Sequence, residues 1–307
     1  PKPSSAASDV YKRQDTTKFR ELASSLTITL GPHQHFPRIL EAPKQRKGRL
    51  GGAGAVRWLF VDYPPFFDRD SLYVMEGGKD YPDNPERFSL FSRAVLEIAK
   101  SVFPADVIHC HDWQAGLVPL LLRTTYSSDP ALRHARTLLT IHNLGYQGLF
   151  PPDALLRAGV SWDEFRIEGL EFFGRVNFLK GALIHSDAVS TVSPTYAREI
   201  QTREFGFGLD GVIAARAGIL HGILNGADYN EWDPAHDAQI AAKYSAKDLA
   251  GKAACKRALL SEYGFPETDV HAPLIGIVSR LTRQKGADLI AEEAAQLMKE
   301  NLRLVVL

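Results

Sequence analysis

From about residue 55 onward, short apolar runs alternate with stretches of helical periodicity. This rhythm predicts an α/β fold built from βαβ units, in which helices connect the strands of a parallel sheet. Several of the runs lack an apolar–polar alternation, which is typical of strands buried on both faces. The expected strands are Val56 to Val61, Asp106 to Cys110, Thr137 to Ile141, Ala188 to Val192, Ile219 to Leu224, Leu274 to Val278 and Leu302 to Leu307.

Helix boundaries are marked at several places between these strands. Asn84 precedes Pro85 and Ser193 precedes Pro194, which predicts two helices that each begin with a capping residue and a proline in the first turn. Gly264 is expected to end a helix that starts near residue 247, because glycine readily adopts the left-handed conformation found after a helix.

The 307 residues suffice for two domains. We expect a Rossmann-like domain over residues 15–225, an interdomain crossover over 226–272, and the start of a second domain over 273–307. Residues 1–14 have little apolar content and predict a disordered or foreign leader. The chain is expected to be cut at both ends, since its final strand is followed by no turn. The glycines of 48–54 do not open a helix after a strand, so they predict a flexible hairpin loop rather than a dinucleotide fingerprint.

Composition excludes several function classes. Lys plus Arg and Asp plus Glu number 36 each, so zero net charge gives no reason to expect a nucleic-acid or anionic-membrane partner. The two cysteines, Cys110 and Cys255, do not make a disulfide framework, and a reducing cytoplasm is the expected compartment. No apolar run approaches the ~20 residues needed to span a bilayer, and no signal-peptide pattern is present.

Ligands of open α/β sheets bind at the carboxyl ends of the strands. The expected strand 106–110 ends in His109-Cys110-His111-Asp112-Trp113. A carboxylate beside an indole suits a sugar, because the carboxylate accepts hydroxyl hydrogen bonds and the ring packs on the apolar sugar face. The alternative is structural: His109 would be a core residue and Asp112 would cap the following helix.

Two further strand ends carry candidate groups. His142 follows the strand 137–141 and enters a glycine-bearing loop, where it could bind a hydroxyl or merely hold its own loop. Arg280 and Lys285 lie between the strand 274–278 and a helix that starts near Gly286. A helix N-terminus with two added cations suits a diphosphate, whereas the alternative is a solvated basic loop.

Taken together and in order, these stretches closely resemble bacterial glycogen synthase and plant starch synthase. The resemblance covers roughly residues 55–307 and only partly the residues before them; for the first 14 residues none is found. It is carried by HCHDWQAGL, TIHNLGYQGLF, EGLEFFGRVNFLKGALIHSDAVSTVSPTYAREI, GILNGADYNEWDP and IVSRLTRQKG, with YPDNPERFSLFSRA and FVDYPPFFDRDSLY also fitting.

The resemblance implies a GT-B glycosyltransferase with two Rossmann-like domains, the second truncated here. Such an enzyme transfers glucose, with retention, from ADP-glucose to the non-reducing end of an α-1,4-glucan, without a metal or other cofactor. The family pattern assigns the sugar pocket to Asp112 and His142 and the acceptor side to Trp113. It assigns the donor side to Asn225, Arg280 and Lys285.

The chain also departs from the family pattern. The KTGGL-type loop at the family's start and most of the second domain are not found in it, so we expect the 307 residues alone to be inactive.

Three alternatives stay open. Another retaining GT-B transferase would use UDP-glucose or a small acceptor, and a non-catalytic glucan-binding fragment would bind without turnover. A metal hydrolase would use His109, His111 and Asp112 as ligands, but it needs further ligands that the sequence does not supply as a second cluster. The oligomeric state is not predicted.

Overall fold

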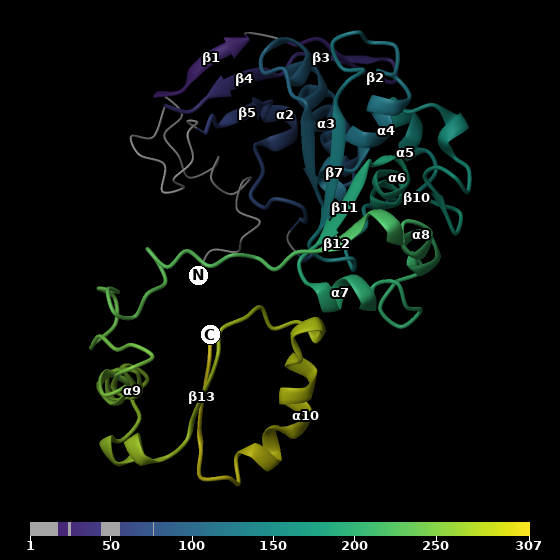
Figure 1. Ribbon diagram of the computed structural model, residues 1–307. Coiled ribbons are helices and arrows are strands. Elements are labelled where there is room, and N and C mark those ends of the chain that lie inside the picture. The colour runs from purple at the N-terminus through teal and green to yellow at the C-terminus, as the bar shows by residue number, and fades with distance from the viewer. Residues whose placement is uncertain (1–17, 24–25, 44–55, 76) are drawn as a thin grey trace. The chain divides into compact units, whose positions relative to one another are not determined.

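The computed structural model describes residues 18–23, 26–43, 56–75 and 77–307, and the chain divides into two units, Pro1–Asn225 and Gly226–Leu307 (Figure 1). Each unit contains its own parallel sheet. Among the described residues, no helix combines the length and the apolar character needed to cross a membrane. The predicted leader (1–14) and the predicted hairpin loop (48–54) lie outside the described residues.

A four-stranded parallel sheet forms the centre of the larger unit, as the sequence predicts (Figure 1). Its strand order is β12–β11–β7–β6. Because all four strands are parallel, the residues that follow them gather at one edge of the sheet. The strands are β6 (Val107–His111), β7 (Arg136–Ile141), β11 (Ala188–Thr191) and β12 (Leu220–Gly222).

Strand β6 is an exception to the expectation that strands are buried on both faces. Ile108 and Cys110 are buried in the main core, whereas Val107, His109 and His111 on the opposite face are exposed. The alternation of exposed and buried residues is that of a half-exposed strand. The structure thus leaves two histidines on an open face of the sheet.

The helices α3 (Asn84–Ser101), α4 (Leu117–Arg123) and α6 (Phe178–His185) contribute apolar residues to the core on the other face. Leu121, Ile141 and Phe178 are among its fully buried side chains. Each such side chain contributes roughly 1.5–3 kcal/mol by leaving water. This core holds the edge of the sheet at which the candidate residues lie.

The helix start at Ser193 is confirmed. Its hydroxyl accepts a hydrogen bond from the N–H of Tyr196 at 3.0 Å and so caps α7 (Pro194–Glu199). The second predicted helix does begin at Asn84, but its capping residue was predicted wrongly, because Asp83 and not Asn84 occupies the capping position. The side chain of Asn84 instead donates to the carbonyl of Tyr73.

The predicted strand at 56–61 exists as β5 (Leu59–Asp62), but it is not part of the parallel sheet. It pairs antiparallel with β4 (Arg38–Glu41), which pairs antiparallel with β1 (Arg20–Ala23). Cross-strand ion pairs such as Arg38–Asp62 favour this pairing. The residue pattern of one strand does not show which other strand it pairs with. The strands β1 and β4 were not predicted.

Short elements complete the larger unit, and most of them were not predicted. They are β2 (Ile28–Leu30), β3 (His33–His35), α2 (Pro64–Phe67), β8 (Leu149–Phe150), α5 (Ala154–Arg157), β9 (Glu171–Phe172), β10 (Arg175–Asn177) and α8 (Asp210–Ala215), with 3-10 turns at Trp113–Ala115, Trp162–Glu164 and Ala217–Ile219.

The smaller unit contains α9 (Gly251–Glu262), β13 (Leu274–Ile277), α10 (Ala287–Leu297) and β14 (Arg303–Val306), with 3-10 turns at Glu267–His271 and Arg283–Lys285. The two strands are parallel and paired in register, so β13, α10 and β14 form the predicted βαβ unit. Gly264 follows α9 with a φ of 73°, which confirms the predicted helix end.

Candidate active site

Asp112 follows β6 directly, and its backbone has a φ of 56°. With a ψ of −167°, this conformation lies outside the left-handed helical region and in one that is essentially confined to glycine, so the Asp112 backbone is strained. Its side chain makes no capping hydrogen bond to the turn that follows, so the structural alternative of a helix cap is wrong. Instead, Oδ1 accepts the N–H of His142 at 2.8 Å, and the N–H of Asn143 also bonds the carboxylate. Asp112 therefore joins the ends of β6 and β7.

His142 and His111 lie beside this carboxylate. His111 Nδ1 and His142 Nε2 are 2.9 Å apart, and the two rings are 5.2 Å apart between centroids. The distance requires that one nitrogen carries the proton and the other accepts it. Two imidazolium rings cannot form this contact, so the pair carries at most one positive charge.

A line of polar side chains crosses the sheet behind the histidine pair. His109 Nε2 lies 2.6 Å from the Thr140 hydroxyl, which lies 2.7 Å from the Ser190 hydroxyl. The two hydroxyls can relay a proton or fix a tautomer, since each both donates and accepts. His109 is thus an exposed, hydrogen-bonded residue, and its interpretation as a core residue is wrong.

Loss of hydration sets the electrostatics of this site, because neighbouring side chains keep part of each ring from water even though His109 and His111 are exposed as whole residues. Burial raises the pKa of the Asp112 carboxyl, and the N–H groups of His142 and Asn143 oppose the rise. Burial, helped by the neighbouring His109 and His142, lowers the pKa of His111 to about 4. Burial likewise lowers the pKa of His109. The site therefore disfavours further positive charge on these two histidines near neutral pH.

These shifts predict a pH dependence of folding stability. Because the pKa of His111 is about 4 in the folded chain and 6.5 without its surroundings, the unfolded chain binds more protons between these values. Stability is then fully present above pH 6.5 and falls toward pH 4, by about 1 kcal/mol after solvent screening. Urea titrations across this range should show a shallower fall for His111→Gln. An identical slope in the variant and the unaltered chain would contradict the assignment.

The indole ring of Trp113 is buried, whereas stacking on a sugar requires an exposed ring face. It is only 6% exposed, and its ring packs edge-on against Phe88 at 4.7 Å and Phe150 at 5.7 Å between centroids. Gly148 lies against the same indole, and a Cβ at that position would come within 2.6 Å of it. The ring is a packing element beneath Asp112 and offers no open face, so its predicted contact with the acceptor is not supported by this geometry.

The predicted donor residues lie in or next to the smaller unit. Asn225 is exposed at the end of the larger unit, and Arg280 and Lys285 are exposed on the segment between β13 and α10. Among the described residues, neither cationic side chain has an acidic partner, whereas Arg283 pairs with Asp288 at 3.2 Å. Arg280 and Lys285 thus keep their charges available to a ligand, and their role in binding a diphosphate stays a prediction.

Comparisons with known proteins decide the family. The starch synthase catalytic domain family matches residues 5–215. The chain is 49% identical to the glycogen synthase of Koribacter versatilis (strain Ellin345) over 97% of its own length and 59% of that protein's. The chain belongs to the starch synthase catalytic domain family. The match begins at residue 5, so the expectation that the first 14 residues bear no resemblance to the family is wrong.

Two further relatives agree. The glycogen synthase of Anaeromyxobacter sp. (strain Fw109-5) is 45% identical over 91% of the chain and 59% of its own length. The catalytic domain of starch synthase IV from Arabidopsis thaliana, solved with ADP and acarbose, has a TM-score of 0.80 at 33% identity. It covers 96% of this chain and 58% of its own, which supports the GT-B class. The chain thus spans somewhat more than half the length of these relatives.

The metal-hydrolase alternative finds no support in the part of the chain that the structure describes. Within it, no group of three or more histidine, cysteine or acidic side chains is arranged to hold a metal ion. The three histidines contact one another and Thr140, and Asp112 is bonded to backbone N–H groups. Cys110 and Cys255 are free, and Cys110 is buried.

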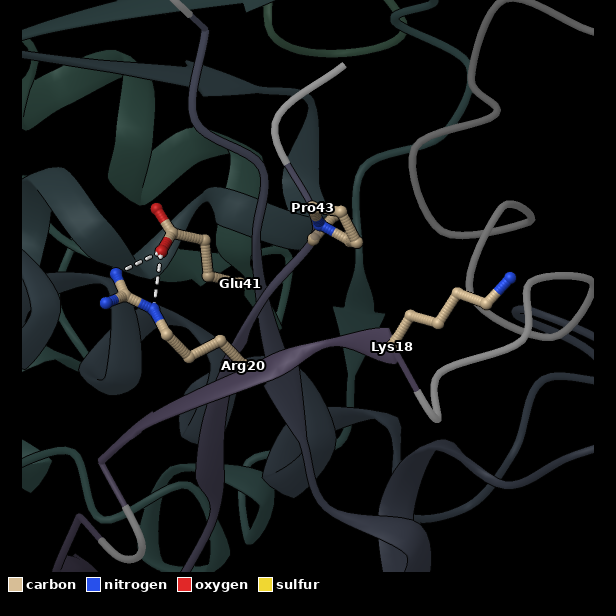
Figure 2. A pocket seen from close by; sticks show the side chains of 5 residues that line it. Lys18, Arg20, Glu41 and Pro43 are labelled. Carbon is tan, nitrogen blue, oxygen red and sulfur yellow. Dashed lines mark hydrogen bonds and ion pairs between the residues drawn. The ribbon is translucent and has the colours of Figure 1, made fainter. Parts of the chain in front are cut away.

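A hollow of about 290 Å³ lies away from these residues, over β1 and β4 (Figure 2). Its lining includes Lys18, Arg20 and Glu41. Arg20 bonds one oxygen of Glu41 at 2.5 Å, and Arg57 bonds the other at 2.6 Å. Both bonds lower the pKa of the Glu41 carboxyl, and the bond from Arg57 has the larger effect. Glu41 is therefore a poor proton donor, and the hollow is lined by an ion-pair network.

Several residues that support the family site were not predicted. The hydroxyl of Tyr196 accepts the N–H of Leu144 at 3.0 Å. The buried Gln147 donates to the carbonyl of Leu144 and accepts from Asn177 at 2.7 Å. Gln147 and Asn177 stand within the segments that carry the resemblance, but only the folded chain shows that they hold the His142 loop.

Proposed function

We propose that the full-length protein is a glycogen (starch) synthase that transfers glucose, with retention, from ADP-glucose to the non-reducing end of an α-1,4-glucan. One observation carries this proposal: at the carboxyl edge of the parallel sheet, the Asp112 carboxylate accepts the backbone N–H of His142 at 2.8 Å, so the two candidate residues are held together there. Family membership and the ADP and acarbose bound to the starch synthase IV neighbour support it. The cytoplasm is the proposed compartment.

Bond breaking at the anomeric carbon leaves positive charge on the sugar and negative charge on the departing ADP. The Asp112 carboxylate suits the first charge, and the nitrogens of His142 suit a sugar hydroxyl. Arg280 and Lys285 suit the diphosphate, since fixed cations stabilise the charge that grows on a leaving group. Holding donor and acceptor in one site contributes by orientation. These steps need no metal, so none is part of the proposal.

The donor assignment is tested by Lys285→Ala in the full-length enzyme. Loss of a cation at the leaving group should lower kcat/KM for ADP-glucose by roughly 10²- to 10³-fold. Arg283→Ala is the matched control, because Arg283 lies in the same 3-10 turn but pairs with Asp288. Equal losses in both variants would show that only the turn, and not a diphosphate contact, was disturbed.

A transfer assay tests the function itself. The full-length enzyme should move glucose from ADP-glucose to glycogen and should prefer ADP-glucose over UDP-glucose in direct competition. Preference for UDP-glucose would favour another retaining GT-B transferase. The 307-residue chain spans 59% of the length of the Koribacter versatilis and Anaeromyxobacter glycogen synthases, and we expect it to bind glucan without turnover.

A further inference from the structure

The hairpin of β9 and β10 has a phenylalanine where its turn favours other residues. Phe172 and Arg175 are paired across the hairpin, so Phe173 and Gly174 form a two-residue turn. Their φ angles are 49° and 74°, the signs of a type I′ turn, for which Asn-Gly is the preferred pair. Phe173 is 82% exposed. A bulky side chain at positive φ is strained, and the Phe173 ring gains little burial in return.

A second Phe-Gly pair repeats this conformation. Phe207 and Gly208 have φ angles of 48° and 81°, and Phe207 is 55% exposed. Phe173, Phe207 and Asp112 are the three non-glycine residues with positive φ among those that the structure describes. Strain of this kind is concentrated at binding sites, and here the third example is the candidate catalytic carboxylate.

The two pairs lie against each other. A Cβ built on Gly208 would lie 3.0 Å from the Phe172 ring and 3.3 Å from the Phe173 ring. The rings of Phe172 and Phe173 are 4.7 Å apart between centroids and meet edge to face. We name the set of Phe172, Phe173 and Phe207 the aromatic ridge. Glycine at position 208 permits this approach, so segments 35 residues apart in the chain present one aromatic surface.

The ridge is continuous with the His142 loop. The side chain of Gln147 donates to the carbonyl of Phe207 at 3.2 Å and to the carbonyl of Leu144 at 3.2 Å. Tyr146, in the same loop, is 50% exposed. One buried amide thus ties the ridge to the loop that presents the candidate catalytic histidine.

We propose that the aromatic ridge binds the α-glucan acceptor beyond the glucose unit that receives the transfer. This inference rests on the proposed function, which supplies a long chain of sugars beside the catalytic groups. Aromatic rings pack on the apolar faces of sugars, and exposed rings next to a sugar site provide that surface without needing a charge. The backbone strain of Phe173 is not offset by burial of its ring within the chain, whereas a bound glucan would cover the exposed parts of the Phe173 and Phe207 rings.

Phe173→Asn separates binding from folding. Asparagine is favoured in the turn, so the variant should unfold about 2–4 °C higher than the unaltered chain. Its affinity for maltoheptaose, measured by calorimetry on the 307-residue chain, should fall by about tenfold. Phe207→Asn should act in the same direction. Phe36→Asn is the matched control, since Phe36 is 53% exposed but has no positive φ, and it should change neither quantity in these ways.

Unchanged maltoheptaose affinity in both ridge variants would overturn the inference, as would failure of the unaltered chain to bind maltoheptaose. Self-association that disappears in Phe173→Asn, without a loss of glucan affinity, would assign the ridge to a second copy of the chain and would also overturn the inference.

The transfer assay on the full-length enzyme tests the proposed function separately from the ridge. Glucan binding at the ridge without glucose transfer would refute the proposed function alone, and transfer with unaltered affinity in the variants would refute the ridge alone.

Discussion

Asp112→Asn should lower kcat/KM for glucose transfer by the full-length enzyme roughly 10²- to 10³-fold, the loss typical of removing one electrostatic group from a transition state. Asparagine has nearly the same shape as aspartate and keeps an oxygen that can accept the His142 N–H. The variant therefore removes the charge and leaves the junction of β6 and β7 in place. Its melting temperature should stay close to that of the unaltered protein.

Two comparisons make this result decisive. Asp112→Ala removes both acceptors and places alanine at positive φ, so it should lose stability as well as activity. Burial raises the pKa of the Asp112 carboxyl, so transfer should decline on the acid side as this group is protonated. Asp112→Asn should lack that acid decline. Activity near that of the unaltered enzyme in Asp112→Asn would show that Asp112 only holds the His142 loop.

The parallel sheet could be predicted because its signal is local. Each apolar run and each helix start depends on consecutive residues. Ser193 and Pro194 are an example, because the helix cap predicted there is present. Pairing between strands depends on residues far apart in the chain. For this reason β5 was predicted as a strand but assigned to the wrong sheet. The two-residue and three-residue strands before and after it are too short to show a period.

The candidate site likewise contains residues that the sequence could predict and residues that it could not. Asp112 and His142 were found because both follow strands that a parallel sheet brings to one edge, and the structure does join them. Trp113 is adjacent to Asp112 in sequence, but its orientation depends on Phe88 and Phe150, which come from other elements. The aromatic ridge depends on backbone φ angles and on the close approach of Gly208 to Phe172. Neither feature can be predicted from the order of residues in the sequence.

Gly148→Ala should destabilise the larger unit by about 2–4 kcal/mol, the sum of a left-handed backbone and an overpacked core. Gly148 has a φ of 65°, and a new Cβ would lie 2.6 Å from Trp113 Cε3 and 2.9 Å from Cδ2. The indole cannot retreat easily, because Phe88 and Phe150 pack against it. Urea denaturation with an unchanged m-value would measure the loss.

Gly174→Ala separates the two contributions. Gly174 has a φ of 74°, but a Cβ there would meet nothing within 4 Å, so the variant carries the backbone strain alone, about 1–2 kcal/mol. Trp113→Leu in the Gly148→Ala background should recover part of the loss, because it removes the atoms that the methyl group meets. The double-mutant cycle would then give a coupling energy between positions 113 and 148. Equal losses for Gly148→Ala and Gly174→Ala, with no coupling to position 113, would show that the buried indole does not fix the loop beside the catalytic groups.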